Sequence, residues 1–310
     1  MPSAPALLGT LSDGSPSSSH TSRISPGFIS SMASFVRTQV MGQISPRRFR
    51  ILSGAIFTPS IENMARRMND PAIFLTGTGT GVGKTVVGCA LASLWAAAGR
   101  GPRVLKPAES GCAAREGGLH PRDAWALKAA AGDGRPLDEI CPYRYGNPMA
   151  PAHAAEEEGG PPDIERIAEM IAALRSRPGP LLVEGAGGLL VPLGPGTRMH
   201  DIAARGGLAL LIVAPLGLGS LNDTQLTVRA AQAEGLSVAG IVLNDRTGED
   251  SPAARRNPAA IGELCDARLL GVFPYLPGIN ADLERGAAPE SRAAARLREA
   301  ARGIDFTAIG

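Results

Sequence analysis

The stretch that most constrains this chain runs from Ile73 to Thr85 and has the sequence IFLTGTGTGVGKT. Its apolar start predicts a buried strand, and the alanine-rich residues 84–98 predict a helix. Between them lies a loop of glycines and threonines that ends in Gly83, Lys84 and Thr85. Glycines allow a loop to wrap closely around a phosphate, and the N–H groups of the loop and of the helix N-terminus then face the anion. We therefore expect a phosphate-binding loop in which Lys84 reaches the β- and γ-phosphates and the Thr85 hydroxyl binds Mg²⁺.

The glycine spacing of this loop departs from the plain phosphate-loop pattern. Counting back from Gly83 along G-x-x-x-x-G-K-[ST], the first glycine belongs at Thr78, but it lies one place earlier at Gly77. A glycine-rich turn without a ligand is the alternative interpretation, yet a Gly-Lys-Thr run between a strand and a helix favours a phosphate. The reaction in which the bound phosphate compound takes part must be inferred from other parts of the chain.

The composition limits the classes of protein to which the chain can belong. Its 310 residues are 44% hydrophobic, which is enough for one sizeable core or two small ones. The formal net charge of +2 gives no reason to expect a nucleic acid or an acidic partner, and the 4% aromatic content argues against RNA binding by base stacking. No apolar run approaches the length of a membrane span.

The cysteines indicate a reducing compartment. Cys89, Cys112, Cys141 and Cys265 are scattered along the chain, and none stands in a paired C-x-x-C spacing. The sequence therefore predicts neither a zinc site nor a disulfide framework. Free thiols are the expected state, and we expect a cytoplasmic protein.

Residues 1–63 differ in composition from the rest of the chain. They are rich in serine and proline, and Asp13 and Glu62 are their only acids. Such a segment cannot bury enough apolar surface to fold alone. We expect a disordered leader, or sequence upstream of a later start at Met64 or Met68. The alternatives are a mitochondrial transit peptide, for which a composition rich in arginine and serine is typical, and a partner-binding arm.

The predicted domain comprises residues 64–310, in which apolar runs alternate with helical patterns. This order predicts a single-domain α/β fold of the P-loop NTPase type, with a mostly parallel sheet and helices on both faces. Ligands of such sheets bind beyond the carboxyl ends of the strands, so we expect functional residues just after each strand. Residues 287–302 predict a terminal helix, for which a surface position is favoured over one with Leu297 and the alanines turned inward. Strands are predicted at 73–76, 103–106, 181–184, 208–214, 238–243 and 269–273, and helices at 84–98, 122–131, 163–175, 223–234 and 252–265.

Charged side chains stand at two of the predicted strand ends. Lys106 ends one strand and is followed by Pro107, and Glu184 ends another before a run of glycines. Asp123, at the start of a predicted helix, can supply a second carboxylate. Mg²⁺ is often bound by one or two carboxylates together with phosphates, so these acids are candidates for a metal site. Taken singly, a surface lysine, a charge that ends a strand and a helix-capping acid are the ordinary alternatives.

Asn244 and Asp245 follow the predicted strand at residues 238–243. A GTPase carries Asn-Lys-x-Asp at this place, whereas this chain has Asp245 and Thr247 at the two positions that specify guanine. An amide there can instead hydrogen-bond adenine, and an asparagine turn is the alternative.

Taken together and in this order, the motifs of the chain resemble those of dethiobiotin synthetase, the ATP-dependent carboxylase of biotin synthesis. The resemblance covers roughly residues 72–278, and it is specific because several motifs follow one another in the right order. They are Gly77–Thr85 with its displaced first glycine, Lys106-Pro-x-x-Ser110-Gly111, Asp123, Val183-Glu184-Gly185-Ala186-Gly187-Gly188, Gly217-x-Gly219-x-x-Asn222, Asn244-Asp245 and Phe273-Pro274.

The resemblance implies a homodimeric P-loop enzyme that uses ATP as co-substrate and Mg²⁺ as cofactor, with no nucleic-acid or membrane partner. In this family CO₂ and 7,8-diaminononanoate form a carbamate on one amine, and ATP phosphorylates the carbamate to a carbamic–phosphoric anhydride. The second amine then closes the ureido ring. The expected products are dethiobiotin, ADP and phosphate.

The functional residues of the family map onto matching positions of this chain. Leu221 and Asn222 are implied to reach the carboxylate of the diamine across the dimer interface. By position, the catalytic residues are Lys106, Lys84 and Thr80; the nucleotide-binding residues are Gly79, Gly81, Val82, Gly83, Lys84, Thr85, Glu184, Asn244 and Asp245; the substrate-binding residues are Ser110, Gly188, Leu221 and Asn222; and the metal ligands are Thr85, Asp123 and Glu184.

The chain also departs from the family pattern. Many members carry acids in the loop where Gly79 and Gly81 stand here, so any contact that those acids make is missing. The family often shows a Ser-Pro-His order near residues 150–153, where the histidine is displaced in this chain, and His153 is assigned no role.

Two related classes of protein are the alternatives. The synthetase part of a cobyrinate amidotransferase would require a fused glutaminase domain, which the residues after the last predicted strand are too few to form. A partition or septum-positioning ATPase would carry a signature lysine at the position of Gly79. The sequence therefore favours the synthetase.

Overall fold

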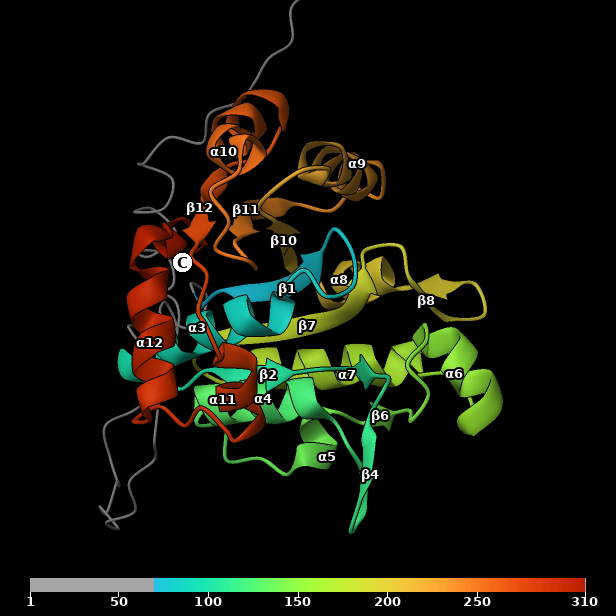
Figure 1. The fold of residues 1–310 in the computed structure, drawn as a ribbon. Coiled ribbons are helices and arrows are strands. Elements are labelled where there is room, and N and C mark those ends of the chain that lie inside the picture. Colours follow the sequence, from blue (N-terminus) through green and yellow to red (C-terminus); the bar gives the residue numbers. More distant parts are fainter. Residues whose placement is uncertain (1–69, 310) are drawn as a thin grey trace, which may run out of the picture. The chain divides into compact units, whose positions relative to one another are not determined.

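A six-stranded sheet forms the centre of the part of the chain that the structure describes (Figure 1). The structure is a computed structural model and describes residues 70–309, so the predicted leader of residues 1–63 and the domain boundary at residue 64 lie outside it. The strand order is β12-β11-β10-β1-β7-β2, and every neighbouring pair is parallel. The strands are β1 (Ala72–Gly77), β2 (Arg103–Leu105), β7 (Leu181–Gly188), β10 (Ala209–Pro215), β11 (Val238–Asn244) and β12 (Leu269–Phe273).

All six predicted strands are present, and their ends differ by a few residues. Strand β7 continues past Glu184 through the glycines to Gly188, and its register against β1 shifts between Leu75 and Gly77. Strand β2 ends at Leu105, so Lys106 is the first residue beyond it. The phosphate loop, Glu184 and Lys106 therefore meet at one edge of the sheet.

Apolar side chains alternate between the two faces of the sheet, and helices cover both faces. Ile73 and Leu75 of β1 belong to one buried cluster, whereas Phe74 between them belongs to the other. Because both faces are buried, the strands are continuous apolar runs, as expected of a parallel sheet. One face is covered by α3 (Lys84–Ala97), α4 (Arg122–Ala131) and α12 (Arg292–Ala300), and the other by α7 (Ile164–Arg175), α8 (Met199–Gly206), α9 (Ser220–Ala233) and α10 (Pro252–Leu264).

Two helices differ from the prediction. Helix α9 begins at Ser220 after Gly219, so Asp223 lies in its first turn rather than at its start. Helix α12 packs on α3 with Ala294 and Leu297 fully buried, which corrects the surface position favoured from the sequence. Shorter helical segments are α5 (Leu137–Ile140), α6 (Pro151–Glu158), α11 (Ile279–Glu284), η1 (Ala301–Gly303) and η2 (Phe306–Ile309).

Three two-stranded sheets were not predicted, because strands of two or three residues leave no periodicity to detect. They are β3 (Ala108–Glu109) with β6 (Tyr143–Arg144), β4 (Ala113–Arg115) with β5 (Gly118–His120), and β8 (Pro192–Gly194) with β9 (Thr197–Arg198). Of these, β3 follows directly on Lys106 and Pro107. Within residues 70–309, no helix has the length and apolar character that crossing a membrane requires.

Candidate active site

The phosphate loop connects β1 to α3 and is held by two hydrogen bonds from side chains. Lys84 Nζ donates to the carbonyl of Gly79 at 3.0 Å, and Asn244 Nδ2 donates to the carbonyl of Val82 at 2.9 Å. Gly83 has a φ of 95°, and a Cβ there would lie 1.9 Å from Asn244 Nδ2. Glycine is therefore required at Gly83 both for its conformation and for the close approach of Asn244.

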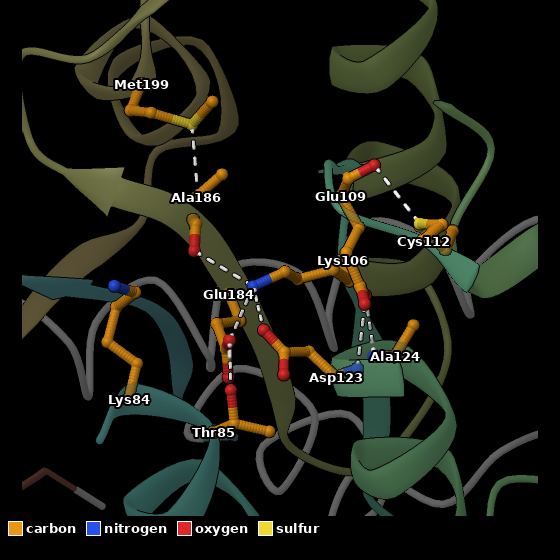
Figure 2. A network of polar contacts seen from close by, with 12 residues as sticks. Lys84, Thr85, Lys106, Glu109, Cys112, Asp123, Ala124, Glu184, Ala186 and Met199 are labelled. Atoms are coloured by element: carbon orange, nitrogen blue, oxygen red, sulfur yellow. Dashed lines mark hydrogen bonds and ion pairs between the residues drawn. The ribbon is translucent and has the colours of Figure 1, made fainter. Parts of the chain in front are cut away.

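Lys106 lies at the centre of a cluster of charged side chains, which we call the Lys106 cluster: Lys106, Glu184, Asp123 and Thr85 (Figure 2). Lys106 Nζ lies 2.6 Å from Glu184 Oε1 and 3.3 Å from Asp123 Oδ2, and it donates to the carbonyl of Gly185 at 3.2 Å. The Thr85 hydroxyl donates to Glu184 Oε1 at 2.9 Å. An ammonium group has three N–H donors, and the contacts of Lys106 with Glu184, Asp123 and Gly185 engage all three.

Burial and opposite charge act against each other in the Lys106 cluster. Burial alone would lower the pKa of Lys106, but the carboxylates of Glu184 and Asp123 outweigh it and hold this pKa above its ordinary value. Burial would raise the pKa of Asp123, but Lys106 outweighs it and the pKa lies below its ordinary value. For Glu184 burial is the larger effect and raises the pKa. Lys106 is therefore a fixed positive charge at neutral pH.

Lys84 differs from Lys106 in its electrostatic surroundings. Among residues 70–309 it has no carboxylate within ion-pair distance, and Figure 2 shows it apart from the Lys106 cluster. Burial, and then the positive charge of Lys106, lower the pKa of Lys84 to about 8. A bound anion would be its natural partner.

Glu109 is a residue of this region that was not predicted. Its side chain is buried, and its two carboxylate oxygens accept from the N–H groups of Asp123 at 2.9 Å and Ala124 at 3.0 Å (Figure 2). Burial raises the pKa of Glu109 to about 7, although Lys106 opposes the shift. Its position between Lys106 and Ser110 was the only signal in the sequence that could have found it.

A cavity of about 600 Å³ joins the phosphate loop to the Lys106 cluster and to the segment after β12. This segment includes Pro274, Tyr275 and Leu276. Phe273-Pro274 is one of the motifs of the resemblance, but no role was predicted for the segment, because no charged side chain marks it. The predicted residues that line the cavity are Thr80, Gly81, Gly83, Lys84, Thr85, Lys106, Ser110, Asp123, Asn244 and Asp245.

The other predicted residues do not line this cavity. Glu184 is fully buried beneath the site, and Gly188 pairs with β1 beside the loop. Asn222, in the first turn of α9, is exposed to solvent. The residues outside the cavity are Gly79, Val82, Glu184, Gly188, Leu221 and Asn222.

The oxygen atoms of the Lys106 cluster fit Mg²⁺. Thr85, Asp123 and Glu184 offer a hydroxyl and two carboxylates in one connected group, and Glu184 Oε2 is buried without a hydrogen-bond partner among the described residues. Within residues 70–309 no group of three or more His, Cys, Asp and Glu side chains is placed to hold a metal ion. Mg²⁺ is usually bound by one or two carboxylates, and the phosphates of the substrate supply further ligands.

Comparison with known proteins identifies the family. A family described as an AAA domain matches residues 71–282. The ATP-dependent dethiobiotin synthetase of Anaeromyxobacter dehalogenans is 46% identical over 207 residues, which are 67% of this chain and 91% of that protein. The chain belongs to the dethiobiotin synthetase family. The ATP-dependent dethiobiotin synthetase of Thermodesulfovibrio yellowstonii is 36% identical over 217 residues, with 67% of this chain and 90% of that protein covered. The family comprises ATP-dependent ligases of biotin biosynthesis.

A solved structure confirms the predicted fold class. The septum site-determining protein MinD of Pyrococcus horikoshii, solved with Mg-ADP, has a TM-score of 0.50 and 21% sequence identity, and the match covers 75% of this chain and 94% of that one. At this identity the likeness concerns the fold alone, a single P-loop NTPase-like α/β domain.

Proposed function

We propose that this chain joins CO₂ to 7,8-diaminononanoate at the expense of ATP, giving dethiobiotin, ADP and phosphate. The observation that carries the proposal is the position of Lys106, a fixed ammonium that lines the same cavity as the phosphate loop and Ser110. A phosphoryl group held by the loop and a carbamate held beside Lys106 would face each other in one cavity.

In the first step an unprotonated amine of the substrate attacks the carbon of CO₂. A C–N bond forms, the amine nitrogen loses a proton to solvent, and the negative charge of the carbamate comes to lie on its oxygens. A positive charge nearby disfavours the ammonium form of the amine, so the permanent charge of Lys106 favours the reactive form. Lys106, Ser110 and Thr80 would then contact the carbamate oxygens.

In the second step a carbamate oxygen attacks the γ-phosphorus, and the bond from that phosphorus to the ADP oxygen breaks. Such a transfer depends on positioning and on stabilisation of charge, which Lys84 and the loop N–H groups would provide. The second amine then attacks the carbonyl carbon of the anhydride, phosphate leaves, and the amine loses a proton. No protein nucleophile is needed, which agrees with four cysteines that are all buried.

Thr85, Asp123 and Glu184 would hold the Mg²⁺ ion. When bound, the ion supplies positive charge to the phosphates of ATP. Asp123 suits this role because its pKa lies below the ordinary value, so its carboxylate is ionised at neutral pH.

Asn244 and Asp245 would bind the adenine end of ATP. Asn244 Nδ2 is already used by the carbonyl of Val82, and Oδ1 has no hydrogen-bond partner within residues 70–309. Recognition of adenine would therefore use Oδ1 as an acceptor for the exocyclic amine. Loop contacts through Gly79, Gly81, Val82 and Gly83 complete the proposed nucleotide site.

We also propose a homodimer, in which Leu221 and Asn222 of one protomer reach the diamine in its partner beside Gly188. The exposure of the neighbouring apolar residues Leu218 (96%) and Leu226 (59%) supports an interface on this side of α9. The free thiols and the bacterial relatives support the proposed cytoplasmic location.

The test is phosphate release from Mg-ATP with bicarbonate, in the presence and absence of 7,8-diaminononanoate. We expect release that depends on the diamine. Phosphate release that is the same with and without the diamine, or no phosphate release at all, would contradict the proposed substrate. ATPase activity stimulated by a protein partner would then be tested.

A further inference from the structure

Helix α4 carries Asp123 in its first turn but has no cap of its own. Its N-cap residue is Pro121, whose side chain accepts no hydrogen bond. The first N–H groups of a helix lack partners within the helix and require other acceptors. In α7 the N-cap Asp163 meets this need, accepting from the N–H groups of Glu165 at 2.9 Å and Arg166 at 3.1 Å.

In α4 the acceptor comes from a different segment of the chain. Glu109 lies in β3, and its carboxylate accepts from both Asp123 N and Ala124 N (Figure 2). The two oxygens of this side chain satisfy two N–H groups of the first turn, which have no acceptor within the helix. Glu109 thus caps α4 across a gap in sequence.

One short segment therefore holds Asp123 at two points. Lys106 contacts its carboxylate, and Glu109 contacts its backbone N–H. The backbone of Glu109 is fixed in turn, because β3 pairs with β6 and its carbonyl accepts from the N–H of Tyr145 at 2.9 Å. The backbone of Asp123 is therefore held on the same segment as Lys106, which its carboxylate contacts.

We propose that Glu109 is a positioning residue, which sets the affinity of the site for its divalent cation by fixing the start of α4 and hence the Asp123 carboxylate. The inference rests on the proposed function, which assigns Asp123 to the metal. Glu109 acts through Asp123 and is not itself a ligand.

The experiment measures Mn²⁺ binding to the full-length protein with saturating ADP, from the EPR signal of free Mn²⁺. Wild type is compared with E109A, E109Q and D123N. We expect E109A to weaken Mn²⁺ binding by at most about thirtyfold, because loss of a helix cap costs up to about 2 kcal/mol. E109Q keeps one acceptor oxygen, so its Mn²⁺ affinity should lie between those of wild type and E109A. If E109A does not fold, E109Q provides the comparison with wild type.

The matched control is D163A. This variant removes a cap with two similar hydrogen bonds from α7, which carries none of the proposed site residues. It should lower the melting temperature about as much as E109A does and leave Mn²⁺ binding unchanged. Weaker Mn²⁺ binding in D163A would mean that the loss in E109A is a general effect of instability, and it would overturn the inference.

A rescue variant separates capping from any direct role of the carboxylate. Pro121 has extended φ and ψ angles that suit a serine N-cap, so P121S in the E109A background supplies α4 with a local cap. We expect the double variant to recover Mn²⁺ affinity to within about threefold of wild type, with P121S alone as its reference.

Two further outcomes would overturn the inference. One is an E109A variant that binds Mn²⁺ as wild type does while D123N binds it weakly. The other is a double variant as weak as E109A, although P121S alone binds normally. If D123N itself binds Mn²⁺ as wild type does, the metal assignment under the proposed function fails instead, so the two failures are distinguishable.

Discussion

The phosphate loop and the Lys106 cluster lie on one cavity but are built differently. The loop is contiguous in sequence, and glycine conformations together with one contact from Asn244 fix its shape. The Lys106 cluster joins the end of β2 to β7 and to the starts of α3 and α4 through buried opposite charges. Its lysine is neutralised by carboxylates, whereas within residues 70–309 the lysine of the loop has no carboxylate within ion-pair distance. The loop can therefore bind an anion, and in the cluster Glu184 Oε2 is left for a cation.

The largest effect on stability should come from Lys106→Met. This change leaves the fully buried carboxylate of Glu184 and the half-buried carboxylate of Asp123 without their cation, and breaking a buried ion pair costs about 3–5 kcal/mol. The loss of unfolding free energy is measured by denaturant titration at pH 7. This loss of unfolding free energy should become smaller as the pH falls, because Glu184 then takes up a proton and no longer carries an unpaired charge. Lys84→Met is the matched control and should cost much less; equal losses in the two variants would remove the contrast between the two regions.

Lys84→Ala should act on catalysis instead of stability. Loss of one preorganised donor to a developing charge typically costs about 10²–10³-fold in turnover. We expect a loss of this size in diamine-dependent phosphate release, with unfolding free energy near that of the wild type. A variant that retains near-normal turnover would contradict the assignment of Lys84 to the phosphates.

Nucleotide binding should depend on pH through Lys84. A lysine is charged below its pKa, and the pKa of Lys84 in the free protein is about 8. ADP affinity should therefore be steady at lower pH and weaken as the pH rises through about 8, by up to about tenfold per pH unit. Calorimetric titrations between about pH 6 and pH 9.5 measure this, and K84A should show no such decline. A wild-type affinity that does not change across pH 8 would show that Lys84 does not titrate there.

The smallest predicted effect is a difference in unfolding free energy between alanine substitutions at two glycines of the loop. A Cβ at either Gly79 or Gly81 would meet open space, but Gly81 has a φ of 72°. Gly81→Ala should cost about 1–2 kcal/mol because a left-handed conformation is unfavourable for a residue with a Cβ. Gly79→Ala should change the unfolding free energy by less than about 0.5 kcal/mol. Equal effects in denaturant titrations would show that φ does not decide which of the two positions tolerates a side chain.

Much of the fold followed from the sequence because its strands are buried on both faces. Runs such as residues 208–214 are apolar throughout, and at other strand ends Lys106, Glu184 and Asn244 mark the ligand edge of the sheet. Helix α12 was misplaced for the opposite reason. The helix is rich in arginine and its alanines are small, so Leu297 alone gave too weak a pattern to predict burial.

The structure brings together residues that the sequence motifs had singled out. Lys84 and Thr85 were predicted from the loop, and Lys106, Asp123 and Glu184 from the ordered set of motifs; their roles stay predictions. Glu109 was missed because its partners are backbone N–H groups of a distant helix, which leave no mark in the sequence. The likeness to MinD illustrates the same limit, since the two chains share a fold class at only 21% sequence identity.

The most direct test of the proposed reaction follows the carbon atom of CO₂. The protein is incubated with ¹³C-bicarbonate, Mg-ATP and 7,8-diaminononanoate, and the product is analysed by ¹³C NMR together with phosphate release. We expect the label in the ureido carbonyl of dethiobiotin, with one phosphate released for each ring formed. Phosphate release without label in a ureido carbon would contradict the proposed function.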